Sequence, residues 1–132
     1  MALLAGCSPG ASTIGGWDGA ALKARAEDAT VACRVRTGRT PPAPFTTDGC
    51  SLSPDGSWQT CCVDHDAVYW CGGSADERER ADRALKTCVA DTGGPTTAAL
   101  YYYAVRAAGG AWMPLPWRWG YGWPWPYRDA RR

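Results

Sequence analysis

Residues 61–69 read CCVDHDAVY and place two thiols, an imidazole and the carboxylate that follows it within little more than two helical turns. On a helix, Cys61 and His65 are four residues apart and share one face. Asp66 and Tyr69 are three residues apart and lie on a neighbouring stripe. One short helix can therefore carry a disulfide, a base and a metal ligand.

Length and composition set limits on the fold. The chain of 132 residues suits a single domain, but 16 glycines, 10 prolines and one phenylalanine leave little aliphatic core, so cross-links are expected. Seven cysteines in so short a chain indicate an oxidising compartment. The net charge of +1 gives no indication of a nucleic-acid partner, and no apolar run is long enough to span a bilayer.

The first cysteine stands apart from the rest. Residues 4–7, LAGC, are typical of the end of a bacterial lipoprotein signal, although no charged leader precedes them. Cys7 is therefore predicted either to be lipidated or to be a free cysteine in a tail, and the protein to be exported, to the bacterial cell envelope or the medium. Six cysteines remain, enough for three disulfides: Cys33, Cys50, Cys61, Cys62, Cys71 and Cys88.

Apolar spacing predicts an all-α domain at residues 17–110, preceded by a signal remnant or tether at residues 1–16. No alternating pattern is long enough to form a sheet, and there is no internal repeat. Four helices are expected, at residues 18–35, 58–70, 74–90 and 96–108.

Turn and capping signals separate these helices. Gly72 and Gly73 break the chain after the second predicted helix, and Ser74 with Glu77 three residues later forms a capping box at the start of the third. Residues 91–95, DTGGP, are expected to end the third helix. The second and third helices can then lie antiparallel across a short turn.

This antiparallel arrangement brings distant side chains together. Cys61 would lie beside Cys88, and a disulfide between them would fix the register of the two helices. Measured from that bond, His65 lies about 6 Å along one helix and Asp82 about 9 Å back along the other, at 1.5 Å per residue. The offset of about 3 Å is within side-chain reach. Asp82 is therefore the predicted partner of His65, able to fix its tautomer and stabilise its imidazolium form.

The pattern C-C-x-x-H-D-x-x-Y resembles the active-site helix of secreted phospholipases A2. The resemblance implies that His65 is the general base and that Asp66 is a calcium ligand. Asp82 lies six residues before Cys88, the spacing that this family uses for the aspartate of its His-Asp pair. Family members use the tyrosine that matches Tyr69 to hydrogen-bond that aspartate, although such a tyrosine more often serves packing.

The resemblance extends over about residues 48–89 and includes a loop. Residues 48–55, DGCSLSPD, are similar to the loop of the bacterial enzymes and differ from the glycine-rich calcium loop of the animal ones. By that similarity, Asp48 would bind calcium through its side chain and Gly49 through its carbonyl. A disulfide between Cys50 and Cys62 would hold this loop against the helix, as in secreted phospholipases.

Several assignments stay open. Cys33 and Cys71 form the third disulfide only by elimination, because six cysteines allow fifteen pairings. The thiols and imidazole of residues 61–66 could instead bind zinc, although adjacent cysteines suit its geometry poorly. Residues 76–80, DERER, are most simply a solvated helix face.

The tail at residues 111–132 differs in composition from the rest of the chain. It holds five of the eight tryptophans, interleaved with prolines and arginines. Such residues favour the headgroup region of a bilayer, so contact with a phospholipid membrane surface is one prediction. The other is that the aromatic rings fold back and complete the core. The two predictions have equal weight.

The resemblance implies an all-α, disulfide-linked, phospholipase A2-like domain with two antiparallel active-site helices. The implied activity is calcium-dependent hydrolysis of the sn-2 ester of glycerophospholipids, with calcium as the cofactor, a phospholipid surface as the partner, and no organic cofactor. Two other hypotheses remain: a catalytically silent lipid-binding or envelope-anchoring module of the same fold, and a structural cysteine-rich lipoprotein in which His65 only completes a polar network.

Overall fold

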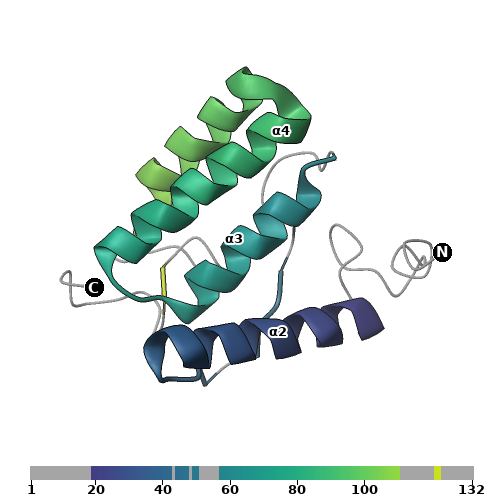
Figure 1. The fold of residues 1–132 in the computed structure, drawn as a ribbon, viewed down its shortest axis with the longest axis vertical. Helices are drawn as coiled ribbons and strands as arrows, with labels where there is room; N and C mark the ends of the chain where they lie inside the picture. Colours follow the sequence, from purple (N-terminus) through teal and green to yellow (C-terminus); the bar gives the residue numbers. More distant parts are fainter. Residues whose placement is uncertain (1–18, 43, 48, 51–56, 111–120, 123–132) are drawn as a thin grey trace.

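Three helices make up the part of the chain that the computed structural model describes, which comprises residues 19–42, 44–47, 49–50, 57–110 and 121–122. They are α2 (Gly19–Thr37), α3 (Gln59–Cys71) and α4 (Ala75–Ala108), and these residues form no strand (Figure 1). The all-α prediction is confirmed for the described residues. The first two helices end within two residues of their predicted bounds.

The turn between α3 and α4 follows its sequence signals. Gly72 (φ 79°) and Gly73 (φ 139°) end α3 in conformations that residues with a Cβ rarely adopt. The Ser74 side chain accepts a hydrogen bond from the backbone N–H of Glu77, and the Glu77 carboxylate accepts one from the N–H of Ser74. This predicted capping box starts α4, whose first part runs antiparallel to α3 (Figure 1).

Helix α4 reverses direction at Gly94, so it consists of two arms: the first arm is residues 75–93 and the second arm residues 95–108. Gly94 has non-helical angles (φ 85°, ψ 166°), and Pro95 follows at the first position of the second arm, where its missing N–H does no harm. The second arm folds back beside the first (Figure 1). The third helix was predicted to end at about residue 90, but the first arm continues through Gly93, and the break lies within the predicted stop at residues 91–95.

Gly93 has a packing reason for lacking a side chain. A Cβ built on Gly93 would lie 2.8 Å from the ring of Trp58, which is closer than real Cβ contacts. Trp58 precedes α3, and its ring also meets Tyr101 edge to face at 6.2 Å between centroids. The reversal of α4 is therefore packed against the start of α3.

Three disulfides tie these elements together: Cys33–Cys71, Cys50–Cys62 and Cys61–Cys88, with Cα atoms 5.5, 5.1 and 5.7 Å apart. The three predicted pairings are the pairings of the structure. The first bond links α2 to the end of α3, the second holds the loop before α3, and the third links α3 to the first arm of α4. Each closes a loop and is worth about 2–4 kcal/mol by restricting the unfolded chain.

The core consists of small clusters, as the composition predicts. The largest joins α3 to both arms through the disulfides and a few aliphatic side chains, among them Leu85, Val89 and Val105. A second cluster lies under α2, where Phe45 packs with Val63 and meets the ring of Trp70 at 5.8 Å between centroids. With so little aliphatic volume, the covalent links contribute a large share of the stability.

Two described residues of the tail pack onto the domain. Tyr121 has no exposed surface, and its ring meets that of Tyr69 edge to face at 5.0 Å between centroids. The backbone N–H of Gly122 donates to the carbonyl of Tyr69 at 2.6 Å. Both contacts support the prediction that the tail completes the core. The five tail tryptophans, Cys7 and the predicted tether lie outside the described residues, so lipidation and membrane contact stay predictions.

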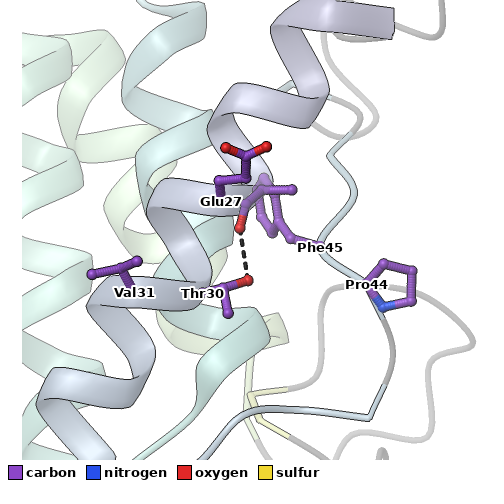
Figure 2. A pocket seen from close by; sticks show the side chains of 6 residues that line it. Glu27, Thr30, Val31, Pro44 and Phe45 are labelled. Carbon is purple, nitrogen blue, oxygen red and sulfur yellow. Dashed lines mark hydrogen bonds between the residues drawn. The ribbon is translucent and has the colours of Figure 1, made fainter.

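A shallow hollow of about 340 Å³ lies between α2 and residues 44–45, with Val31 and Phe45 in its lining (Figure 2). It is mostly apolar, and none of the predicted site residues lines it. No helix in the described part of the chain is long and apolar enough to cross a membrane.

The burial of Tyr121 generates a test of the tail. Tyr121→Ala is expected to lower the free energy of unfolding by about 3 kcal/mol, because loss of a buried aromatic ring leaves a cavity beside Tyr69. Tyr103→Ala is the matched control, since Tyr103 is 65% exposed and its loss should change stability by less than about 0.5 kcal/mol. Urea unfolding followed by circular dichroism measures both. Equal stability of the two variants would contradict the packing of the tail on the domain.

Candidate active site

The predicted pairing of His65 with Asp82 is present in the structure. Nε2 of His65 lies 2.7 Å from Oδ1 of Asp82, which joins the middle of α3 to the first arm of α4. Both residues are buried, with 8% of His65 and none of Asp82 exposed. The Cys61–Cys88 disulfide holds the two helices in the register that brings these side chains together.

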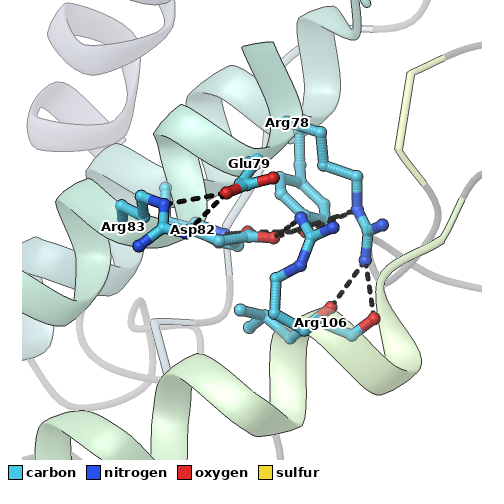
Figure 3. Close-up of polar contacts among 8 residues, drawn as sticks. Arg78, Glu79, Asp82, Arg83 and Arg106 are labelled. Carbon is cyan, nitrogen blue, oxygen red and sulfur yellow. Dashed lines mark hydrogen bonds and ion pairs between the residues drawn. The ribbon is translucent and has the colours of Figure 1, made fainter. Parts of the chain in front are cut away.

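Asp82 accepts hydrogen bonds at both carboxylate oxygens. Oδ1 is shared between His65 and the hydroxyl of Tyr69, which donates at 2.7 Å. Oδ2 accepts from Nη1 of Arg106 at 2.7 Å, and Nε of Arg78 lies 4.0 Å from the same oxygen (Figure 3). The carboxylate is thus surrounded by donors from α3 and from both arms of α4.

These donors determine the charge state of Asp82. Burial raises the pKa of its carboxyl group, but the hydrogen bonds from His65 and Tyr69, the charge of the imidazole and the hydrogen bond from the nearby guanidinium together outweigh burial. The pKa of Asp82 therefore lies below its ordinary value of 3.8. Asp82 is ionised at neutral pH and acts only as a hydrogen-bond acceptor.

Tyr69 is held as a protonated donor. Burial raises the pKa of its hydroxyl well above the ordinary value of 10.0, the negative charge of Asp82 raises it further, and the charge of Arg78 opposes both without outweighing them. Its ring lies against that of His65 at 4.2 Å between centroids. Tyr69 therefore both packs on the imidazole and bonds its carboxylate partner, which joins the two roles that the sequence left open.

Arg78 corrects the prediction that residues 76–80 form a solvated face. Its side chain is buried, and its Nε donates to the hydroxyl of Tyr69 at 3.0 Å. Its Nη2 donates to the carbonyls of Val105 and Arg106 at 2.8 and 3.1 Å (Figure 3). Arg78 lies four residues before Asp82, so the same face of the first arm that presents the carboxylate also turns this arginine inward.

Arg106 was missed by the sequence analysis, although two signals were available. It is the one charged residue among residues 95–108, in a stretch of small, apolar and tyrosine side chains. Arg106 also lies twelve residues after Gly94, and Asp82 lies twelve residues before Gly94. In a helical hairpin that reverses at Gly94, residues at equal distances from the turn lie side by side.

The predicted metal ligands are described only in part. Asp66 is buried on α3, and its Oδ2 accepts a hydrogen bond from the hydroxyl of Thr47 at 2.6 Å. The same hydroxyl accepts from the backbone N–H of Gly49 at 3.0 Å, so the loop lies against Asp66. Asp48 lies outside the described residues. Thr47, which the sequence analysis did not single out, links the loop to the helix in addition to the Cys50–Cys62 disulfide.

The side chains that remain available around Asp66 limit which metals could bind there. The zinc alternative is excluded because Cys61 and Cys62 are both bonded in disulfides, which leaves no thiolate for a soft metal. No group of three or more His, Cys, Asp or Glu side chains within the described ranges is arranged to hold a metal ion. Among the predicted calcium ligands, Asp66 is the one side chain that the structure describes, and its carboxylate is an oxygen ligand of the type that calcium binds.

Comparison with known proteins gave no match: no protein-family model matches the chain, and neither the curated proteins nor the solved structures give a significant match. The fold and the site define a small, disulfide-linked all-α protein with a buried His-Asp pair. The resemblance to secreted phospholipases A2 remains a hypothesis carried by the motif at residues 61–69.

The electrostatics of Asp82 predict a pH dependence of stability. A depressed pKa stabilises the fold fully above the ordinary value of 3.8, and this contribution is lost as the pH falls through the lower value of the folded state. Asp82→Asn should therefore be about 3–5 kcal/mol less stable than the native protein near neutral pH, and the difference should shrink below about pH 3.8.

Urea unfolding of both proteins at about pH 7 and about pH 3 measures this difference. Asp91→Asn is the control, because Asp91 is an exposed carboxylate of the same arm. A gap between Asp82→Asn and the native protein that is as large in acid as at neutral pH would contradict an ionised, hydrogen-bonded Asp82.

Proposed function

We propose that this protein is a calcium-dependent phospholipase A2 that hydrolyses the sn-2 ester of glycerophospholipids and releases a fatty acid and a lysophospholipid. The observation that carries the proposal is the buried contact of 2.7 Å between Nε2 of His65 and Oδ1 of Asp82. The motif at residues 61–69 supplies the substrate class by resemblance.

The ionised state of Asp82 determines what His65 can do. A carboxylate only accepts hydrogen bonds, so Nε2 of His65 is the donor in this contact, and in the neutral imidazole Nδ1 keeps its lone pair. Nδ1 is then the nitrogen that can take a proton from a water molecule. Asp82 stabilises the imidazolium that forms, and the burial of the pair strengthens this interaction relative to one in water.

The neighbours of the pair favour a fixed geometry. Tyr69 donates to the same oxygen as His65, and its ring covers one side of the imidazole. Arg106 holds the other oxygen of Asp82. A base held in place by satisfied hydrogen bonds needs no reorganisation when it takes a proton, which is the condition for efficient general-base catalysis.

Asp66 and the loop before α3 would hold calcium. The loop is fixed by the Cys50–Cys62 disulfide and by the hydroxyl of Thr47, and it carries Asp48 and Gly49, the other proposed ligands. Bound there, calcium would provide a positive charge for the lipid phosphate and for the carbonyl oxygen that becomes negative. Asp66 directly follows His65 in the chain, so α3 would supply both the general base and a calcium ligand.

We propose export to an oxidising compartment as part of this function. The three disulfides support it, because such bonds persist outside the reducing cytosol. A phospholipid membrane surface in the bacterial envelope or outside the cell is then the partner within reach. Lipidation of Cys7 remains part of the same proposal.

Replacement of the base tests the activity. The native protein is expected to release lysolipid from vesicles of labelled phosphatidylcholine in the presence of calcium and to stop when a chelator is added. His65→Gln should reduce the rate by about a hundredfold to ten-thousandfold, the usual contribution of a general base. Asp64→Asn is the control, because this exposed residue of α3 is one position before the base and should keep the native rate.

Absence of lysolipid from the native protein, with calcium and without it, would overturn the proposal. Binding of the same vesicles without hydrolysis would then favour the silent lipid-binding module. Neither binding nor hydrolysis would favour a structural lipoprotein.

The calcium site generates a separate prediction. Calcium is expected to change the fluorescence of the eight tryptophans in a saturable manner. Asp66→Asn should weaken this binding by about tenfold or more, because it removes a charged ligand and the partner of Thr47. Asp64→Asn serves as the control with the same chemical change on an exposed side chain. Equal calcium affinity of Asp66→Asn and Asp64→Asn would exclude Asp66 as a ligand.

A further inference from the structure

The last turn of the second arm of α4 lies directly against the candidate active site. Arg106 donates to Oδ2 of Asp82, although 24 residues separate the two in the chain. Gly109, which caps the arm, lies so close to Tyr69 that a Cβ on it would be 2.6 Å from the ring. Two independent contacts therefore place this turn beside the pair formed by His65 and Asp82.

Arg106 fixes the orientation of the Asp82 carboxylate plane, which the hydrogen bonds from His65 and Tyr69 leave less restricted. His65 and Tyr69 both donate to Oδ1, so they hold one oxygen and leave rotation of the carboxylate about it less restricted. The terminal torsion of an aspartate is broad and does not settle into a sharp rotamer. A donor at Oδ2 fixes the plane of the carboxylate. Arg106 donates there at 2.7 Å, whereas Nε of Arg78 is 4.0 Å from the same oxygen, beyond hydrogen-bond distance.

Arg78 fixes the backbone from which Arg106 extends. Its guanidinium donates to the carbonyls of Val105 and Arg106 in the last turn of the helix, and the Val105 carbonyl also accepts from the backbone N–H of Gly109. The same guanidinium donates to the hydroxyl of Tyr69. Arg78 thus ties the end of the second arm to the residue that shares Oδ1 of Asp82 with His65.

We propose that Arg106 is a positioning residue for His65, acting through Asp82, and that the second arm of α4 carries it to the site. This inference rests on the proposed function for its catalytic meaning. The structural role does not depend on that function. Arg106 keeps Oδ1 of Asp82 directed at Nε2 of His65. The neutral imidazole therefore carries its proton on Nε2 and leaves Nδ1 as the nitrogen with the lone pair.

The experiment follows the tautomer of His65, the one histidine of the chain, by ¹⁵N NMR of the folded protein at a fixed pH where the imidazole is neutral. The native protein should show the Nε2–H tautomer. Arg106→Gln should show a mixture of both tautomers, and Arg106→Lys should restore the native signal, because a single donor to Oδ2 is what the contact requires. Arg80→Gln is the matched control, since Arg80 is an exposed arginine of the first arm.

Kinetics provide the second readout. In the active protein, Arg106→Gln should lower kcat by up to about a hundredfold and leave KM nearly unchanged, because the loss lies in the orientation of the base. Arg106→Lys should recover most of the rate.

The outcomes separate this inference from the proposed function. A native tautomer and a native kcat in Arg106→Gln would overturn the positioning role even if the native protein is a phospholipase. A mixed tautomer in Arg106→Gln that lysine restores, in a protein without hydrolytic activity, would support the positioning role and overturn the function. If Arg106→Gln does not fold, Arg106→Met replaces it, because methionine keeps a long side chain but has no donor for Oδ2 of Asp82. A native tautomer in folded Arg106→Met would overturn the inference.

Discussion

A carboxylate without exposed surface destabilises a fold unless hydrogen bonds compensate for its lost hydration, and Asp82 has that compensation from two segments besides its own. Helix α3 contributes His65 and Tyr69, and the second arm of α4 contributes Arg106. Each donor reaches Asp82 only if its segment is packed in place. The geometry of the site and the packing of α3 against both arms of α4 therefore depend on each other.

Covalent bonds do much of what a larger core would do in this chain. The aliphatic clusters are small, and all six cysteines of the described domain are paired. Cys61–Cys88 sets the register of the two helices that carry His65 and Asp82, while Cys33–Cys71 attaches α2. Hydrogen bonds then determine the fine geometry, because each acts over a shorter range than the helix packing that the disulfides impose.

The fold could be predicted to the extent that its signals are local. Two local signals were enough for α3 and the first arm of α4: the capping box at Ser74, and the spacing along each helix of the cysteines and of His65 and Asp82. The rise of about 1.5 Å per residue converts that spacing into distance. The role of Arg106 depends on a third segment, and it required knowing that α4 reverses at Gly94. The burial of Arg78 within residues 76–80 was not predicted, because a run of charged residues does not show which of its side chains faces inward. The packing of the tail was left open between two alternatives, because Tyr121 and its partner Tyr69 are fifty-two residues apart and no local signal connects them.

The reversal of α4 also limits how this chain can change in length. Asp82 and Arg106 stand at equal distances from Gly94, and each residue of a helix turns its side chain by about 100°. Insertion or deletion of a single residue in either arm would swing one of the two away from the other, even if every amino acid in contact were kept. Alternatives that preserve the pair must alter both arms together or add residues at the bend itself. Homologous chains should therefore tolerate substitutions along the outer faces of the arms far better than gaps within them.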